Sequence, residues 1–224
     1  LLNFVFASVL QICIFYTSNS INKNSTDEVV CTIIGVVLHY SIVSQFCWMF
    51  VIAILQFKRF VEVLTAPPKH VLLKACLCGW VLPCLPVACV YFLVTDTYVN
   101  GNVGLCYPSG LGLYLGVWLP IAIVVVVNFV IFVYIIYSVV HKKTKSSDSG
   151  NGDVMFQWRL AILLFFMLGM TWSFGFLSEL NFGEVFVYVF CFTATLQGFV
   201  MFLFFIVFNA NTRYLYVNAC KKHN

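Results

Sequence analysis

Nearly all the positive charge of this chain lies in alternate gaps between long apolar stretches. Six stretches contain no Asp, Glu, Lys or Arg, and they cover residues 1–16, 32–57, 75–94, 111–140, 160–178 and 185–208. All but the first reach the roughly 17 to 25 residues that a helix needs to cross about 30 Å of hydrocarbon. The sequence therefore predicts an all-α fold, a polytopic membrane helix bundle with six spans.

The charge pattern also predicts the orientation of these spans. The gaps at 58–74 and 141–159 and the tail after 208 hold eleven of the twelve Lys and Arg residues. By the positive-inside rule these segments face the cytoplasm. Asn24 begins an N-glycosylation acceptor, Asn-Ser-Thr, which independently places the gap at 17–30 outside. Two unrelated signals thus predict the same topology.

The composition indicates that the bilayer is the main solvent of the chain. Hydrophobic residues make up 62% of it and charged residues 9%, whereas a soluble domain is about 45 to 50% apolar. The formal charge of +4 comes from bases at helix ends, where they set orientation and meet anionic lipid. We therefore predict membrane lipid as a partner and no nucleic acid. No catalytic triad, metal cluster or phosphate-binding loop stands out, so we predict no enzyme, cofactor or metal.

One membrane domain, residues 1–224, is predicted, with no internal repeat. Its polar segment 141–157 should be a flexible cytoplasmic loop, and 209–224 a cytoplasmic tail. The chain opens in the middle of an apolar run, so we expect further sequence upstream. Three prolines lie inside predicted spans, where proline kinks a helix and frees carbonyl groups; they are Pro83, Pro86 and Pro120.

The cysteines divide by their predicted location. Only Cys31 and Cys106 face the oxidising outside, so a disulfide between them is the economical pairing, with two free thiols as the alternative. Cys220, beside two lysines of the tail, resembles a palmitoylation site, with an unmodified thiol as the alternative. Cys76 and Cys78 lie in an apolar run without a second pair, which favours packing over metal binding.

Short sequence motifs inside the spans, taken in order, resemble those of a known receptor family. The second span reads CTIIGVVLHYSIVSQFCWMF, the third contains GWVLP, the fifth MLGMTWSFGF and the sixth LQGFVMFLFF. Together they resemble spans two to seven of an adhesion G-protein-coupled receptor, over essentially the whole chain. The resemblance implies that the first helix of a seven-helix receptor precedes this sequence.

The resemblance implies a multi-pass signalling receptor of the plasma membrane. Such a receptor relays the signal of an extracellular ligand, or of a tethered peptide agonist, to a heterotrimeric G protein. A secretin-like hormone receptor, a six-span transporter or channel, and a signalling-inert receptor remnant are the alternatives. Spans free of charge and the missing inverted repeat count against transport.

The candidate agonist pocket and switch consist of aromatic and polar residues. By resemblance, an inserted agonist packs against Trp172, although an ordinary core aromatic is the alternative. Gln197 is polar at mid-membrane depth and should bond across helices, either as structural support or as a ligand contact. His39 is either a proton sensor or a hydrogen-bonded packing residue. The predicted set is Trp48, Tyr107, Trp118, Trp172, Phe174, Phe176 and Gln197.

A G-protein face is predicted at the inner end of the second span. It would consist of Leu55, Gln56, Lys58 and Arg59, bordering the cavity that a G-protein helix enters. Anchoring to lipid headgroups explains the two bases equally well. The family usually has a His-Leu-Tyr-like sequence here, and this chain departs from it at residues 55–57.

The predicted topology can be tested on intact cells. Tags at Asn24 and Cys106 should react without permeabilisation, whereas tags at Arg59 and Lys143 should react only after it. Asn24→Gln should also remove a glycosidase-sensitive mass shift. A single tag on the wrong face would contradict the topology.

Overall fold

The computed structural model describes residues 2–22, 28–61, 70–94, 98, 107–144, 162, 165, 171–179 and 185–202. They lie in helices and the short connections between them. The chain divides into two compact units, residues 1–127 and 128–224, and the boundary falls inside one helix.

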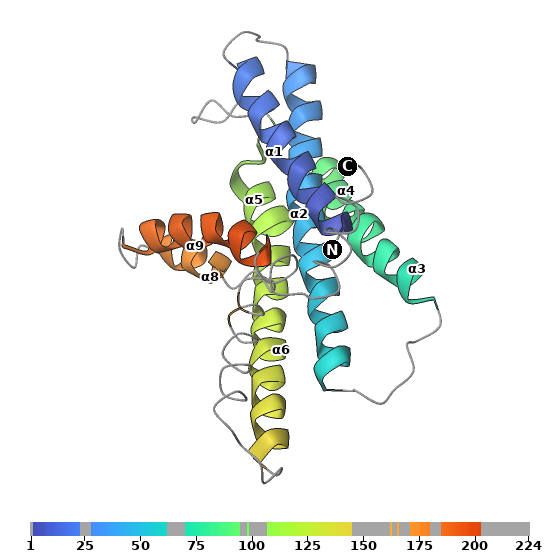
Figure 1. Ribbon diagram of the computed structural model, residues 1–224. Coiled ribbons are helices and arrows are strands. Elements are labelled where there is room, and N and C mark those ends of the chain that lie inside the picture. The colour runs from blue at the N-terminus through green and yellow to red at the C-terminus, as the bar shows by residue number, and fades with distance from the viewer. Residues whose placement is uncertain are drawn as a thin grey trace, which may run out of the picture. The chain divides into compact units, whose positions relative to one another are not determined.

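Three long helices and one shorter helix begin in the first unit (Figure 1). Two of the long helices are interrupted by a π-helical turn. The segments α3, η1 and α4 follow one another as one helix interrupted by a π-helical turn, and α5, η2 and α6 repeat this arrangement. The bounds are α1 (Leu2–Asn22), α2 (Glu28–Phe60), α3 (Val71–Cys76), η1 (Leu77–Val81), α4 (Cys84–Leu93), α5 (Gly110–Leu113), η2 (Tyr114–Trp118) and α6 (Leu119–Thr144).

Three helices of the described part are long and apolar enough, by length and composition, to cross a membrane. They are Glu28–Lys58, Val71–Leu93 and Gly110–Ser138, and a shorter apolar helix covers Leu2–Ser18. The all-α fold class is thus confirmed for the described residues, and the bundle of six spans stays a prediction. Many apolar side chains face outward, as in Phe92, which is 78% exposed. Such a surface suits hydrocarbon, in which a helix satisfies its own backbone groups.

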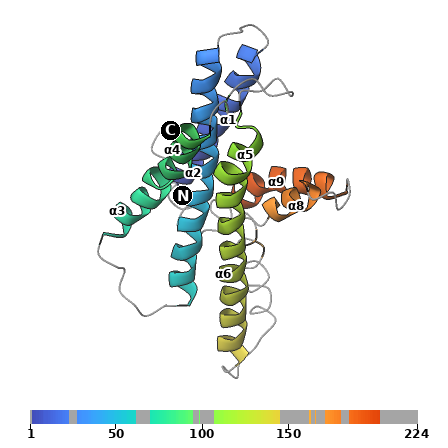
Figure 2. The same cartoon turned by 180° about the vertical axis from the view of Figure 1, so that it is seen from behind.

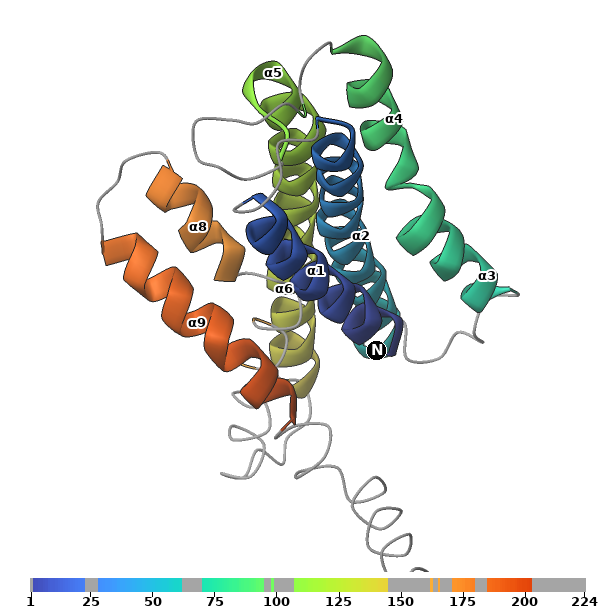
Figure 3. The same cartoon turned by 90° about the horizontal axis from the view of Figure 1, so that it is seen from above.

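Helix α2 is the centre of the first unit. It contacts α1, η1, α4 and η2. Seen from above, α2 lies between α1 and α4 (Figure 3). The view from behind shows α5 beside the N-terminal half of α2 (Figure 2). Side chains of α2 that are fully buried include Leu38, His39, Phe46 and Met49.

Prolines explain the two interrupted helices. Pro83 and Pro120 have no N–H, so the carbonyls of Gly79 and Gly116, four residues earlier, lack their usual helical donor. Each π-helical turn ends just before its proline, and Leu82 N–H donates to Leu77 O, five residues back, at 3.0 Å. Pro86 lies in the first turn of α4, where its missing N–H matters less.

The same two glycines permit close helix packing. A Cβ atom on Gly79 would collide with the indole of Trp48 on α2. A Cβ atom on Gly116 would collide with Val90 and lie 2.9 Å from Cε1 of His39. Helix backbones can approach this closely only where the facing residue is small. The two glycines therefore bring both interrupted helices against α2.

In the second unit, α8 (Thr171–Glu179) and α9 (Val185–Phe202) contact each other. The ring centroids of Trp172 and Phe190 lie 5.1 Å apart across this contact. Thr171 is fully buried, whereas Tyr188 is 71% exposed. One face of α9 thus packs on α8 while another stays uncovered by the described residues.

We expect Gly79→Ala to destabilise the domain by about 1 to 3 kcal/mol, because the added methyl overpacks the contact with Trp48. Thermal unfolding in detergent measures the effect. Val81→Ala, at a side chain that is 55% exposed, is the control and should change little. Combining Gly79→Ala with Trp48→Phe should recover part of the loss. Equal stability of Gly79→Ala and the parent chain would refute the close packing.

Candidate functional site

His39 connects α2 to a loop residue and to η2. Its Nε2 atom lies 2.9 Å from the carbonyl oxygen of Gly116, and its Nδ1 atom lies 2.9 Å from the hydroxyl of Tyr98. A carbonyl oxygen can only accept, so Nε2 carries the proton of the neutral ring and the Tyr98 hydroxyl donates to Nδ1. Both ring nitrogens are satisfied, as in the packing histidine that was one of the two sequence interpretations of His39.

Two further side chains of α2 donate to η1. The Ser44 hydroxyl donates to the Gly79 carbonyl at 2.8 Å, and the Tyr40 hydroxyl donates to the Trp80 carbonyl at 2.8 Å. Tyr40 and Ser44 are four residues apart, so they lie on the same face of α2. Ser44 thereby supplies the donor that Pro83 removes.

The two helices flanking α2 share one design. In each, a glycine precedes a proline by four residues, as in GWVLP at 79–83 and GVWLP at 116–120. In each, the glycine carbonyl accepts a hydrogen bond from α2, from Ser44 in one case and His39 in the other. The repeated spacing is the signal that could have found Gly116 from the sequence, whereas nothing in the sequence pattern indicates the roles of Ser44 and Tyr98.

An aromatic cluster reinforces the contact with η1. Trp48 is 4% exposed, and its ring centroid lies 5.6 Å from that of Trp80, in an edge-to-face arrangement. Phe6 of α1 meets Trp80 from another side at 5.8 Å. The Nε1 proton of Trp48 is buried and meets no acceptor among the described residues. Trp48, predicted to line the agonist pocket, thus packs inside the first unit.

At the other end of α2, Cys31 is buried and disulfide-bonded. Its Sγ atom lies 3.8 Å from the carbonyl oxygen of Tyr98, a packing contact because a disulfide sulfur carries no proton. Cys106 lies outside the described residues, so its pairing with Cys31 stays a prediction. Burial raises the pKa of Tyr98 and of Tyr107 to about 12, which keeps both phenols neutral at physiological pH.

The predicted agonist set is divided between the two units. Trp48, Tyr107 and Trp118 belong to the first unit, and Trp172, Phe174 and Gln197 to the second. Tyr107, Trp118, Trp172, Phe174 and Gln197 are each half-buried. Trp172 packs on Phe190, and Phe174 lies 6.4 Å from Phe165 by ring centroids. A pocket that joins the two groups stays a prediction.

The predicted G-protein face is also divided. Leu55 and Lys58 line a groove between α2 and α3, whereas Gln56 is half-buried and does not line it. The side chain of Arg59 is outside the described set, as is that of Phe176. Asn24 and Cys220 are likewise outside it, so glycosylation and palmitoylation stay predictions. Among the residues searched, no group of His, Cys, Asp or Glu could hold a metal ion.

Comparison with known proteins identifies the family. The model of the family described as "7 transmembrane receptor (Secretin family)" matches residues 1–201. The chain belongs to this receptor family. Its relatives carry the names of adhesion receptors, which confirms the adhesion-type resemblance and a multi-pass receptor domain of the plasma membrane. The two alternatives of a secretin-like hormone receptor and of a six-span transporter or channel are not favoured.

Three relatives illustrate the similarity. Human "Adhesion G-protein coupled receptor G2" is 27% identical over 195 residues, which are 82% of this chain and 19% of the relative. Mouse "Adhesion G-protein coupled receptor G4" is 26% identical over 186 residues, 82% of this chain and 6% of the relative. Rat "Cadherin EGF LAG seven-pass G-type receptor 3" is 26% identical over 202 residues, 87% of this chain and 6% of the relative. The chain thus spans a small part of these much longer receptors.

We expect Ser44→Ala to destabilise the receptor domain by about 1 to 3 kcal/mol, because the Gly79 carbonyl would be left buried without a donor. Ser41→Ala is a matched control. Ser41 is equally buried on the same helix, but its hydroxyl donates at 2.8 Å to Leu38, whose carbonyl has a helical partner of its own. Thermal unfolding should separate the two variants. Equal losses would mean that Ser44 acts only through packing.

Proposed function

We propose that this chain is the transducing domain of an adhesion-type receptor, which passes an extracellular signal to a heterotrimeric G protein. The family match over residues 1–201 supports this assignment, as do relatives whose names include "G-protein coupled receptor". The chain acts by a shift between helix arrangements rather than by chemistry at a bound substrate.

The observation that carries the proposal is the bonding of α2 to two interrupted helices. His39 and Ser44 donate to carbonyls that Pro120 and Pro83 leave without helical donors. In a regular helix each carbonyl accepts a hydrogen bond from an N–H of the same helix. A carbonyl freed by proline can instead exchange one side-chain donor for another. Such exchange lets one helix shift against its neighbour without leaving backbone groups unpaired in lipid. A receptor requires this kind of movable but satisfied contact.

The signal-receiving element in this proposal is the pair Trp172 and Phe190. Their rings lie 5.1 Å apart at the contact of α8 with α9. An apolar agonist side chain that packs on Trp172 would change this contact and so favour one arrangement of the two helices. A tethered peptide or another extracellular ligand fits this role, because aromatic surfaces bind apolar anchors well.

The G-protein face in this proposal is the inner end of α2. Gln56 and Lys58 lie at this end, and the sequence continues into Arg59. Lysine and arginine at a membrane surface attract acidic partner surfaces. The chain departs from the family's usual sequence at Leu55, so the strength of its coupling to a G protein has to be measured.

The decisive experiment is expression of the complete natural gene product with assays of second messengers and of ion flux. G-protein activation without flux is expected. Flux without activation would refute the proposal, and absence of both in a surface-expressed protein would favour an inert receptor.

We further expect Phe190→Ala to change the ratio of agonist-stimulated to basal signalling by about tenfold, equivalent to roughly 1.4 kcal/mol between two arrangements. Phe192→Ala is the matched control, because Phe192 lies on the same helix and is 67% exposed. Cell-surface expression must be measured for both variants. Equal responses of the two variants would remove Trp172 and Phe190 from the switch.

A further inference from the structure

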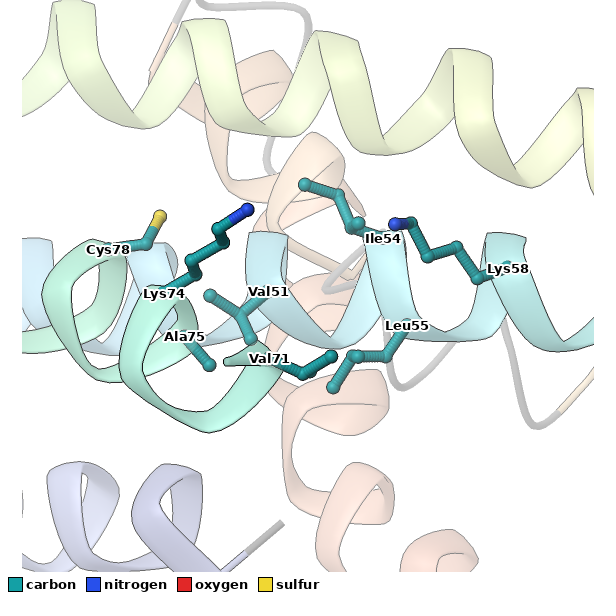
Figure 4. Close-up of a pocket in the computed structure, with 8 residues that line it drawn as sticks. All are labelled: Val51, Ile54, Leu55, Lys58, Val71, Lys74, Ala75 and Cys78. Atoms are coloured by element: carbon teal, nitrogen blue, oxygen red, sulfur yellow. The ribbon is translucent and has the colours of Figure 1, made fainter. Parts of the chain in front are cut away.

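A groove of about 280 Å³ lies between the end of α2 and the start of the helix that begins with α3. Its walls are mostly apolar, and both helices contribute to them (Figure 4). The lining residues are Val51, Ile54, Leu55, Lys58, Val71, Lys74, Ala75 and Cys78. All belong to the first unit.

Two lysines give this groove a positive charge. Lys58 comes from α2 and Lys74 from α3, and none of the described residues that line the groove is acidic. Figure 4 shows both ammonium groups on the same side of the groove, with the Ile54 side chain between them in this view. An anion held near both ammonium groups would be attracted by two positive charges.

The surroundings of the groove are suited to lipid rather than to water. Leu72 is 72% exposed, Leu73 59% and Leu77 51%, and all three lie on the same helix as Lys74. Leu55, inside the groove, is 42% exposed. Leucines so exposed beside a membrane span face hydrocarbon, while long lysine side chains reach to the headgroup level. The groove therefore adjoins both the hydrocarbon region and the headgroup region of the membrane.

We propose that this groove is a specific binding site for one anionic phospholipid of the cytoplasmic leaflet. The headgroup phosphate binds between Lys58 and Lys74, and the upper part of an acyl chain lies along Val51, Val71 and Ala75. A soluble phosphate would use only the lysines, whereas a phospholipid also covers the apolar wall. The bound lipid would join the inner ends of α2 and α3.

The test uses the full-length receptor purified in detergent and native mass spectrometry of lipid adducts. The probes are phosphatidylserine, phosphatidylcholine and inorganic phosphate. We expect retained phosphatidylserine and little phosphatidylcholine. The double variant K58Q/K74Q should lower phosphatidylserine retention about tenfold, since two cationic contacts are lost. The matched control K142Q/K143Q removes the same charge from the C-terminal end of α6 and should retain the lipid.

A second variant tests the apolar wall without changing charge. Ala75→Phe fills the groove and should also reduce retention of phosphatidylserine, while inorganic phosphate should not compete with the lipid. If this variant unfolds, photo-crosslinking of a diazirine-labelled phosphatidylserine to the parent chain replaces it, with labelling expected within residues 71–78. Equal loss in the two lysine pairs, competition by inorganic phosphate, or labelling spread over all helices would overturn the site and leave only general surface attraction.

Discussion

Two backbone carbonyls without helical donors set the arrangement of the first unit. Pro83 and Pro120 remove the N–H groups that would bond Gly79 and Gly116. In a bilayer, where no water reaches the chain, an unpaired carbonyl costs several kcal/mol, so a donor must come from another helix. Helix α2 provides both donors, Ser44 and His39, and therefore has to contact both interrupted helices, which also contact each other.

The geometry of α2 allows it to satisfy both neighbours. His39 and Ser44 are five residues apart, which turns their side chains about 140° around the helix axis. One therefore points to η2 and the other to η1. The glycines that carry the two carbonyls also permit the backbones to approach, so close packing and hydrogen bonding depend on the same residues. Specific positions on three helices are thus coupled.

The inner end of α2 divides its polar residues in the same way. Leu55 and Lys58 line the groove shared with α3, and Gln56, one residue further, is turned about 100° away from Leu55. One face of this helix end can therefore contact lipid while another contacts a cytoplasmic protein. The proposed lipid contact therefore uses Lys58, and the proposed G-protein contact uses the face on which Gln56 lies.

The sequence by itself determined the membrane solvent, the helical class and the family, because span length and ordered motifs are local properties that no packing can reverse. The orientation that the charge distribution predicts stays a prediction. The sequence also indicated that Pro83 and Pro120 free carbonyls. Only the tertiary structure decided which groups donate hydrogen bonds to those carbonyls, since Ser44 and His39 are 35 and 77 residues away from Gly79 and Gly116 along the chain. The same holds for Trp48, which packs on Gly79, and for the groove between Lys58 and Lys74, because contacts across helices depend on rotation and approach that no single span encodes.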